Sequence, residues 1–101
     1  MGLRERMALI EGFSGRDKGT VREAMEYMYG DWEDEGKPGG MWNRYIMRNE
    51  EDFMEDLYGR LEGMGEPRHR RDEMLDQPLA AFMALAREIQ KHAENPPKRK
   101  P

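Results

Sequence analysis

Apolar residues recur along this chain at intervals of three and four, which is the spacing of one face of an α-helix. The first such stripe comprises Leu3, Met7 and Ile10, with Phe13 near the same side. A second stripe, Val21, Ala24, Met25 and Met28, follows Thr20 and Glu23, which match a capping box at a helix start. The pattern therefore predicts amphipathic helices over 3–13 and from Thr20 to a stop at Gly30.

Residues 41–48 read MWNRYIMR, and their pattern fits two kinds of element. In a helix, Trp42, Tyr45 and Ile46 would share one side, whereas in a strand the aromatic residues would alternate with polar ones. We favour the helix and keep the strand as the alternative.

Two clearer helices follow, separated by a short helical piece. Asn49 is the expected cap of the first of them, and the acids at 50–52 match the positive end of its dipole. Its stripe is Phe53, Met54, Leu57, Tyr58, Leu61 and Met64, and Gly63, Gly65 and Pro67 should end it. RHRRDEML at 68–75 predicts one or two further turns. Asp76 is the expected cap of the last helix, with Pro78 in its first turn and a stripe from Leu79 to Ala93.

Together these elements predict an all-α fold. With 101 residues, the chain has room for one small core. We expect a single helical domain over residues 1–95, built as an irregular bundle of four to five short helices. PPKRKP at 96–101 should form an extended, basic, proline-rich C-terminal tail.

The amino-acid composition limits the partners, the cross-links and the cellular location that we expect for such a bundle. The formal net charge is -4, which opposes binding of phosphate backbones by the molecule as a whole. The absence of cysteine excludes disulfides and thiolate metal sites. The longest uncharged stretch, residues 77–86, is about half the roughly 20 residues that a membrane-spanning helix needs. We expect no membrane segment and a cytoplasmic location.

The stretch GFSGRDKGTV, residues 12–21, has some features of a phosphate-binding loop. In a P-loop, however, lysine follows the second glycine, and a buried strand leads into the loop. Here Lys18 precedes Gly19 and a helix is expected upstream. Two interpretations stay open: a capped helix entry, or a weak anion site at the helix start formed by Arg16, Lys18 and Thr20.

No residue pattern indicates an enzyme, a metal or a cofactor. The acids at 31–35 and 50–56 lack the ligand spacing of a calcium-binding loop. His69 and His92 do not form the paired Glu-x-x-His motifs of a carboxylate bundle. Ser14 is the only serine and has no activating partner nearby in the sequence.

Two basic clusters support nucleic-acid binding as an alternative function. They consist of Arg68, Arg70 and Arg71, and of Lys98, Arg99 and Lys100. Arginine grips phosphate bidentately, but Asp72 and Glu73 directly follow the first cluster and would repel the same phosphates. Pairing of these arginines within the protein is therefore the competing interpretation.

The segment YMYGDWEDEGKPGGMWNRY, residues 27–45, gathers both tryptophans and three of the four tyrosines at the two ends of a polar crossover. We expect Trp42 to pack in the core, and for Trp32 the core and the surface stay equally open. A partner-binding surface here would use aromatic anchors and acidic selectors of a basic partner: Tyr29, Trp32, Trp42 and Tyr45, with Asp31, Glu33, Asp34 and Glu35.

The wide apolar stripes exceed what a small lone bundle can bury, and ten methionines suit an adaptable contact surface. The leading hypothesis is a non-enzymatic protein-binding module: an adaptor, assembly factor or inhibitor that docks on a larger protein partner or self-associates as a homo-oligomer. Such a chain would also suit a viral accessory protein encoded by a phage or mobile element. The alternative is a nucleic-acid-binding or nucleoprotein-associated protein.

Overall fold

The computed structural model describes Phe13 and residues 15–94, and this part of the chain is all-α. Its elements are α2 (Gly15–Asp34), the short 3-10 helix η1 (Gly39–Met41), α3 (Trp42–Arg48), α4 (Glu50–Gly63), α5 (Arg68–Leu75) and α6 (Leu79–Glu94). The predicted all-α bundle of short helices is confirmed. The stripe at residues 3–10 and the tail at 96–101 lie outside the described residues.

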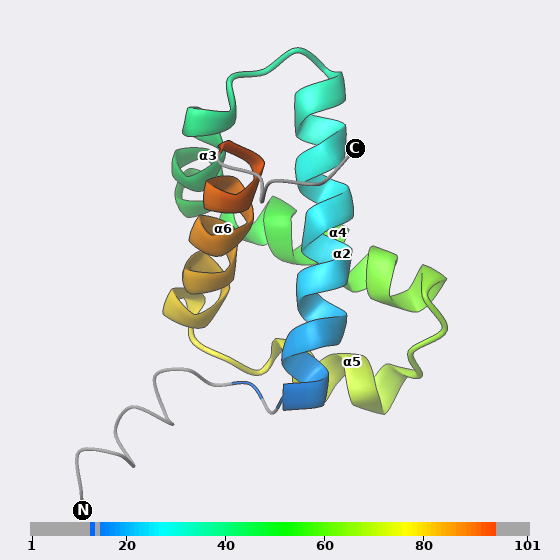
Figure 1. Cartoon of the computed structure of the whole chain (residues 1–101). Helices are drawn as coiled ribbons and strands as arrows, with labels where there is room; N and C mark the ends of the chain where they lie inside the picture. The colour runs from blue at the N-terminus through cyan, green and yellow to red at the C-terminus, as the bar shows by residue number, and fades with distance from the viewer. Residues whose placement is uncertain (1–12, 14, 95–101) are drawn as a thin grey trace, which may run out of the picture.

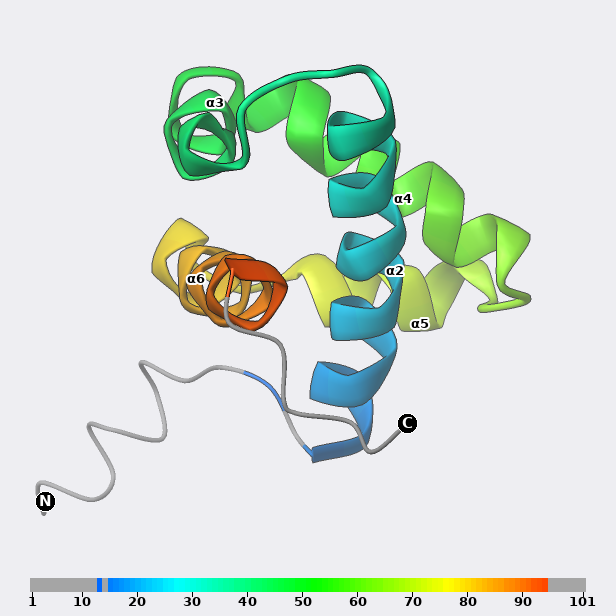
Figure 2. The same cartoon turned by 45° about the horizontal axis from the view of Figure 1, so that its top comes forward.

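The helices do not form a regular bundle: α2 crosses α6 and α4, whereas α3 and α6 run alongside each other (Figure 1 and Figure 2). α2 and α6 pack together, α4 crosses behind α2, and α5 lies near the start of α2 (Figure 1). Turning the molecule shows α3 beside α6, at the end of the molecule where α2 stops (Figure 2). The crossover between α2 and α3 therefore covers one end of the core.

α2 is longer than the pattern predicted, and both predicted ends are wrong. The helix starts at Gly15, so Thr20 lies inside it, where its hydroxyl donates a hydrogen bond to the carbonyl of Arg16 at 3.2 Å. It also continues through Gly30 to Asp34. A glycine inside a helix costs only about 1 kcal/mol relative to alanine, and the buried face of α2 outweighs that cost.

The C-terminal ends of α2 and α4 have the same backbone geometry. Gly36, with φ of 79°, follows α2, and Gly65, with φ of 92°, follows α4. In each case the glycine N–H donates to the carbonyl three residues back, and the next N–H donates to the carbonyl five residues back. This is a Schellman motif, and it favours glycine because a side chain is strained at positive φ.

α3 is a helix, so the favoured interpretation of residues 41–48 is confirmed and the strand is wrong. Asn49 joins α3 to α4 without a break. It occupies the N-cap position of α4, but its side chain makes no capping bond there. Instead its amide Nδ2 donates to the carbonyl of Tyr45 at 3.0 Å, which satisfies the end of α3.

The predicted cap of the last helix is also misplaced. Asp76 is the C-cap residue of α5, and α6 begins at Leu79. The residue before a proline is disfavoured in helical conformation, so Gln77 stays outside and the helix forms only after Pro78. The carbonyl of Pro78 accepts the N–H of Ala81 at 2.9 Å.

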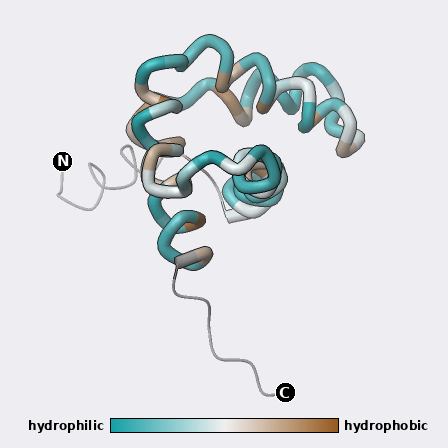
Figure 3. The backbone as a smooth tube through the Cα atoms, turned by 90° about the horizontal axis from the view of Figure 1, so that it is seen from above, coloured by the Kyte–Doolittle hydropathy of each residue, from teal (hydrophilic) through white to brown (hydrophobic). Residues whose placement is uncertain are grey.

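One apolar core joins the described helices. Each of the longer helices carries hydrophobic and hydrophilic residues in turn (Figure 3), and the hydrophobic ones meet inside. Phe82 is central, because its ring packs against Phe53 at 6.2 Å and Phe13 at 5.2 Å between centroids. Full burial of such a side chain contributes about 1.5–3 kcal/mol. The other fully enclosed large side chains are Trp42, Met25, Ile46, Leu57, Leu61, Met74, Leu85 and Val21.

Candidate protein-binding surface

The crossover between α2 and α3 is short and tightly held. After Gly36 reverses the chain, Pro38 leads into η1, and the N–H of Met41 donates to the Pro38 carbonyl at 3.1 Å. Gly39 lies so close to the Tyr29 hydroxyl that a Cβ atom at this position would collide with it. The glycines of this segment therefore permit a close turn over the end of α2, and the segment is not a loose linker.

Two of the predicted anchors belong to the core. Tyr29 is 4% exposed and Trp42 is 1% exposed, and their rings meet edge to face with centroids 4.8 Å apart. The expectation that Trp42 packs inside agrees with this placement. As partner contacts, however, Tyr29 and Trp42 have almost no surface to offer in this conformation, because the crossover folds both rings inward.

Trp32 and Tyr45 lie at the edge of the core, and both are partly buried. Their ring centroids are 5.1 Å apart. The indole N–H of Trp32 donates to the carbonyl of Pro38 at 2.8 Å, and the ammonium of Lys37 lies 4.9 Å from the ring centroid. Trp32 is thus fixed from three sides while part of its ring stays accessible.

Half of the predicted acidic selectors are already paired within the protein. Asp31 contacts the Arg60 guanidinium at 2.5 Å, and Glu35 contacts Lys37 at 2.7 Å. Glu33 and Asp34 are exposed and form no ion pair with another described residue. The charge available to a partner at this surface therefore comes from Glu33 and Asp34.

Arg60 ties the crossover to α4. Besides Asp31 it contacts Asp56, one turn earlier in its own helix, at 2.9 Å. Burial lowers the pKa of Arg60, but the hydrogen bonds and charges of the two carboxylates outweigh burial, so the pKa is raised above its ordinary value. The contribution of charged Arg60 to the free energy of unfolding is therefore present at neutral pH. It is lost only as the pH rises through this raised, alkaline pKa.

A hollow of about 150 Å³ opens between Trp32, Tyr45 and Arg60. Sites for small molecules usually measure about 300–1,000 Å³. The hollow is therefore the size of a single protruding side chain from a partner. We define the crossover surface as Trp32 and Tyr45 with the exposed acids Glu33 and Asp34.

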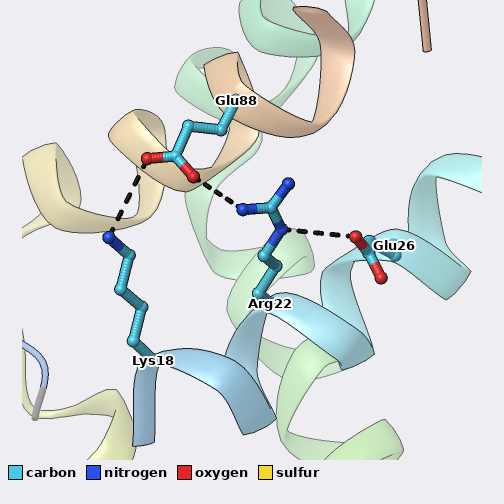
Figure 4. A network of polar contacts seen from close by, with 4 residues as sticks. All are labelled: Lys18, Arg22, Glu26 and Glu88. Atoms are coloured by element: carbon cyan, nitrogen blue, oxygen red, sulfur yellow. Dashed lines mark hydrogen bonds and ion pairs between the residues drawn. The ribbon is translucent and has the colours of Figure 1, made fainter. Parts of the chain in front are cut away.

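The anion site at residues 16–20 was predicted on a helix start at Thr20, and α2 starts earlier, at Gly15. The backbone N–H groups of Gly19 and Thr20 lie beyond the first turn of α2 and are used inside the helix. Lys18 points toward Glu88 of α6, with 3.9 Å between the charged atoms, and Arg22 contacts the same carboxylate at 2.8 Å and Glu26 at 3.3 Å (Figure 4). This network joins α2 to α6.

The first basic cluster is largely engaged within the protein. Arg70 forms ion pairs with Asp17 of α2 and with Glu73. The hydrogen bond to Glu73 is the main reason that the pKa of Arg70 is raised. Arg71 donates to the carbonyl of Glu66 at 2.7 Å, and its guanidinium lies 4.7 Å from the Tyr58 ring centroid. Arg68 is exposed, and Lys98, Arg99 and Lys100 lie outside the described residues.

Sequence reasoning missed a second apolar opening, on α4. Met54 and Tyr58 belong to the predicted apolar stripe, but both are only partly buried and line an open hollow with Leu75. The signal that could have found it is the width of the stripe, since Phe53, Leu57 and Leu61 alone fill the inward face. Large apolar side chains that are plainly exposed are Tyr27, Met41 and Met47, at 60%, 44% and 56%.

Comparison of the chain with protein-family models, with curated proteins and with solved structures finds no match. Within Phe13 and residues 15–94, no cluster of three or more histidine and carboxylate side chains has the geometry to hold a metal ion. No helix in the same part of the chain has both the length and the apolar character needed to cross a membrane.

Proposed function

We propose that this protein is a non-enzymatic protein-binding module that acts as an adaptor, assembly factor or inhibitor on a larger partner. The observation that carries this proposal is the placement of Trp32, an aromatic ring that is fixed by its neighbours and still partly open to solvent. The contact would be made through the crossover surface, and a cytoplasmic setting stays a prediction.

A pre-fixed aromatic side chain is an efficient anchor. Ordering a mobile side chain at an interface costs roughly 0.5–1.5 kcal/mol, and Trp32 has largely met that cost within the free protein. Tryptophan is among the residues enriched at interface hot spots, where removal costs at least about 2 kcal/mol. The free acids Glu33 and Asp34 beside it favour a partner with a basic rim.

The nucleic-acid alternative has less support. Arg70 already has two carboxylate partners within the protein, and Arg71 is held by a backbone carbonyl and an aromatic ring. Recruiting either guanidinium to a phosphate would break these contacts. The alternative therefore depends on Arg68 and on the tail lysines and arginine at 98–100.

The proposal is tested by affinity capture from the native host followed by mass spectrometry, comparing wild type, Trp32→Ala and Tyr27→Ala. Tyr27 is a matched control, because it is an exposed aromatic residue of the same helix that lies outside the crossover surface. A partner retained by wild type and by Tyr27→Ala should be lost by Trp32→Ala, with a fall in affinity of about 30-fold or more.

Far-ultraviolet circular dichroism should show that all three proteins have the same helix content. Equal capture by wild type and Trp32→Ala would contradict the proposal. Loss of helicity in Trp32→Ala would instead assign that ring to the core.

A further inference from the structure

An open hollow lies on the outer face of α4, where that helix meets the end of α5. It measures about 620 Å³ and is lined by Glu50, Glu51, Met54, Glu55, Tyr58 and Leu75. We call it the acid-rimmed hollow. Its apolar side chains, Met54, Tyr58 and Leu75, are partly buried and form the floor, while the three glutamates are exposed and form the rim.

The floor is held in place by contacts between α4 and α5. The hydroxyl of Tyr58 donates to Asp72 at 3.1 Å, and Arg71 stacks over the same ring. Met54 stands one turn before Tyr58, and a methionine side chain adapts its shape to different neighbours at little cost. The floor of the hollow therefore combines a fixed side chain, Tyr58, with an adaptable one, Met54.

The rim carries negative charge that no ion pair with a described residue neutralises. Glu50, Glu51, Asp52 and Glu55 form no ion pair with any residue in the described part of the chain, whereas Asp56 beside them is paired with Arg60. The positive end of the α4 dipole favours the first three acids, but its effect fades within one turn and does not reach Glu55. An approaching cation would therefore be attracted to this rim.

A second, smaller hollow of about 420 Å³ adjoins the first. It is lined by Met47, Arg48 and the residues 49–52, so Glu50 and Glu51 belong to both hollows. Met47 is 56% exposed. The shared acids thus lie between two apolar positions, Met47 in one hollow and the floor at Met54 in the other.

This combination specifies the chemistry of the occupant. A purely basic segment, such as the PPKRKP tail of this chain, meets the rim but has no long apolar side chain for the floor. The segment at residues 3–12 has apolar residues, but its two arginines are offset by two glutamates. An amphipathic helix with lysine or arginine flanking its apolar side chains satisfies both requirements.

We propose that the acid-rimmed hollow binds a basic amphipathic helix of a partner protein. Apolar side chains of that helix fill the floor at Met54, Tyr58 and Leu75, and its cations pair with Glu51 and Glu55. This contact is separate from the crossover surface and does not depend on Trp32. It gives the module a second binding face of defined charge.

The test uses the full chain, labelled for NMR, and a synthetic amphipathic helical peptide made of leucine and lysine. A peptide with glutamate in place of lysine is the probe control. The lysine peptide should shift the resonances of Met54, Tyr58 and Leu75 in a saturable manner, and the glutamate peptide should not. Added salt should weaken the binding, because exposed ion pairs are screened.

Two variants with the same change in net charge separate local from general attraction. Glu51→Gln/Glu55→Gln should weaken lysine-peptide binding by about three- to tenfold, which corresponds to two exposed ion pairs. Glu33→Gln/Asp34→Asn, on the crossover surface, should leave it within about twofold of wild type, because those acids lie outside the hollow. Leu75→Ser should weaken binding without changing its salt dependence, with circular dichroism confirming an intact fold.

Absence of saturable shifts at the floor residues overturns the proposal. Equal weakening by the two double variants also overturns the proposal, because the attraction would then come from the net charge of the protein and not from the acids of the rim. A peptide footprint centred on Trp32 and Tyr45 would also overturn it, by transferring the basic partner to the crossover surface.

Discussion

The crossover surface and the acid-rimmed hollow both leave apolar side chains partly open to solvent, yet their electrostatics differ. Around Trp32 the charges are mostly matched, since Arg60 is shared by Asp31 and Asp56 and Lys37 pairs with Glu35. Around Met54 and Tyr58, the acids of the rim have no cationic partner among the described residues. The crossover surface keeps two unpaired acids, Glu33 and Asp34, among paired charges, whereas every acid on the rim of the hollow is unpaired among the described residues.

This difference shows that apolar exposure alone does not identify a partner. Charged side chains that form ion pairs within the protein hold the surrounding chain in place and contribute little to the long-range attraction of a partner. Unpaired charged side chains attract opposite charge and make association sensitive to salt. We therefore expect binding at the crossover surface to depend mainly on shape, with a smaller salt dependence from Glu33 and Asp34, and binding at the acid-rimmed hollow to depend more strongly on salt.

The largest expected effect separates the two tryptophans. Trp42→Ala should lower the free energy of unfolding by about 3–5 kcal/mol, because it empties a fully enclosed site. Trp32→Ala should cost about 1 kcal/mol, in line with one lost hydrogen bond at a partly buried position. Urea unfolding followed by circular dichroism measures both changes. Similar costs would mean that Trp32 is a core residue and that the crossover surface has no free anchor.

A medium effect concerns the C-terminal ends of α2 and α4, the helices that carry these two regions. Gly36→Ala and Gly65→Ala should each lower the free energy of unfolding by about 1–2 kcal/mol, since both backbones are left-handed. Gly30→Ala and Gly59→Ala are the controls, because each lies inside a helix with open space around the position of a new Cβ atom. These should be stabilising by about 0.5–1 kcal/mol.

Midpoints of urea unfolding will rank the four glycine variants. If Gly36→Ala proved neutral, the crossover would not depend on its left-handed turn. The two regions would then differ in backbone as well as in charge.

The smallest effect compares two neighbouring acids on α4. Asp56→Asn should lower the free energy of unfolding by about 0.3–0.5 kcal/mol, because it removes an exposed ion pair with Arg60. Glu55→Gln should raise it by about 0.2–0.5 kcal/mol, because it relieves repulsion with Glu51 one turn earlier. Measurements at low salt and at about 1 M salt should show both changes shrinking. If both substitutions changed the free energy of unfolding in the same direction, the proposed difference between paired Asp56 and unpaired Glu55 would be wrong.

The sequence by itself determined the fold class and the buried face of α2. The spacing of Val21, Ala24, Met25 and Met28 requires one apolar side, and each of them is buried. The stop at Gly65 was also readable, because a left-handed turn favours glycine whatever packs around it. These features are local, so the residues that cause them are near one another in the chain.

Tertiary structure decided the length of α2 and which charged side chains form ion pairs. Gly30 ends the helix only when no tertiary contact holds the residues after it, and here Trp32 packs against the core and Asp31 pairs with Arg60. Arg60 reaches Asp31, and Arg70 reaches Asp17, across long separations in sequence. Whether an acid is matched or free, and whether an indole is enclosed or open, depends on which distant segments the fold brings together, and helical periodicity does not encode those distances.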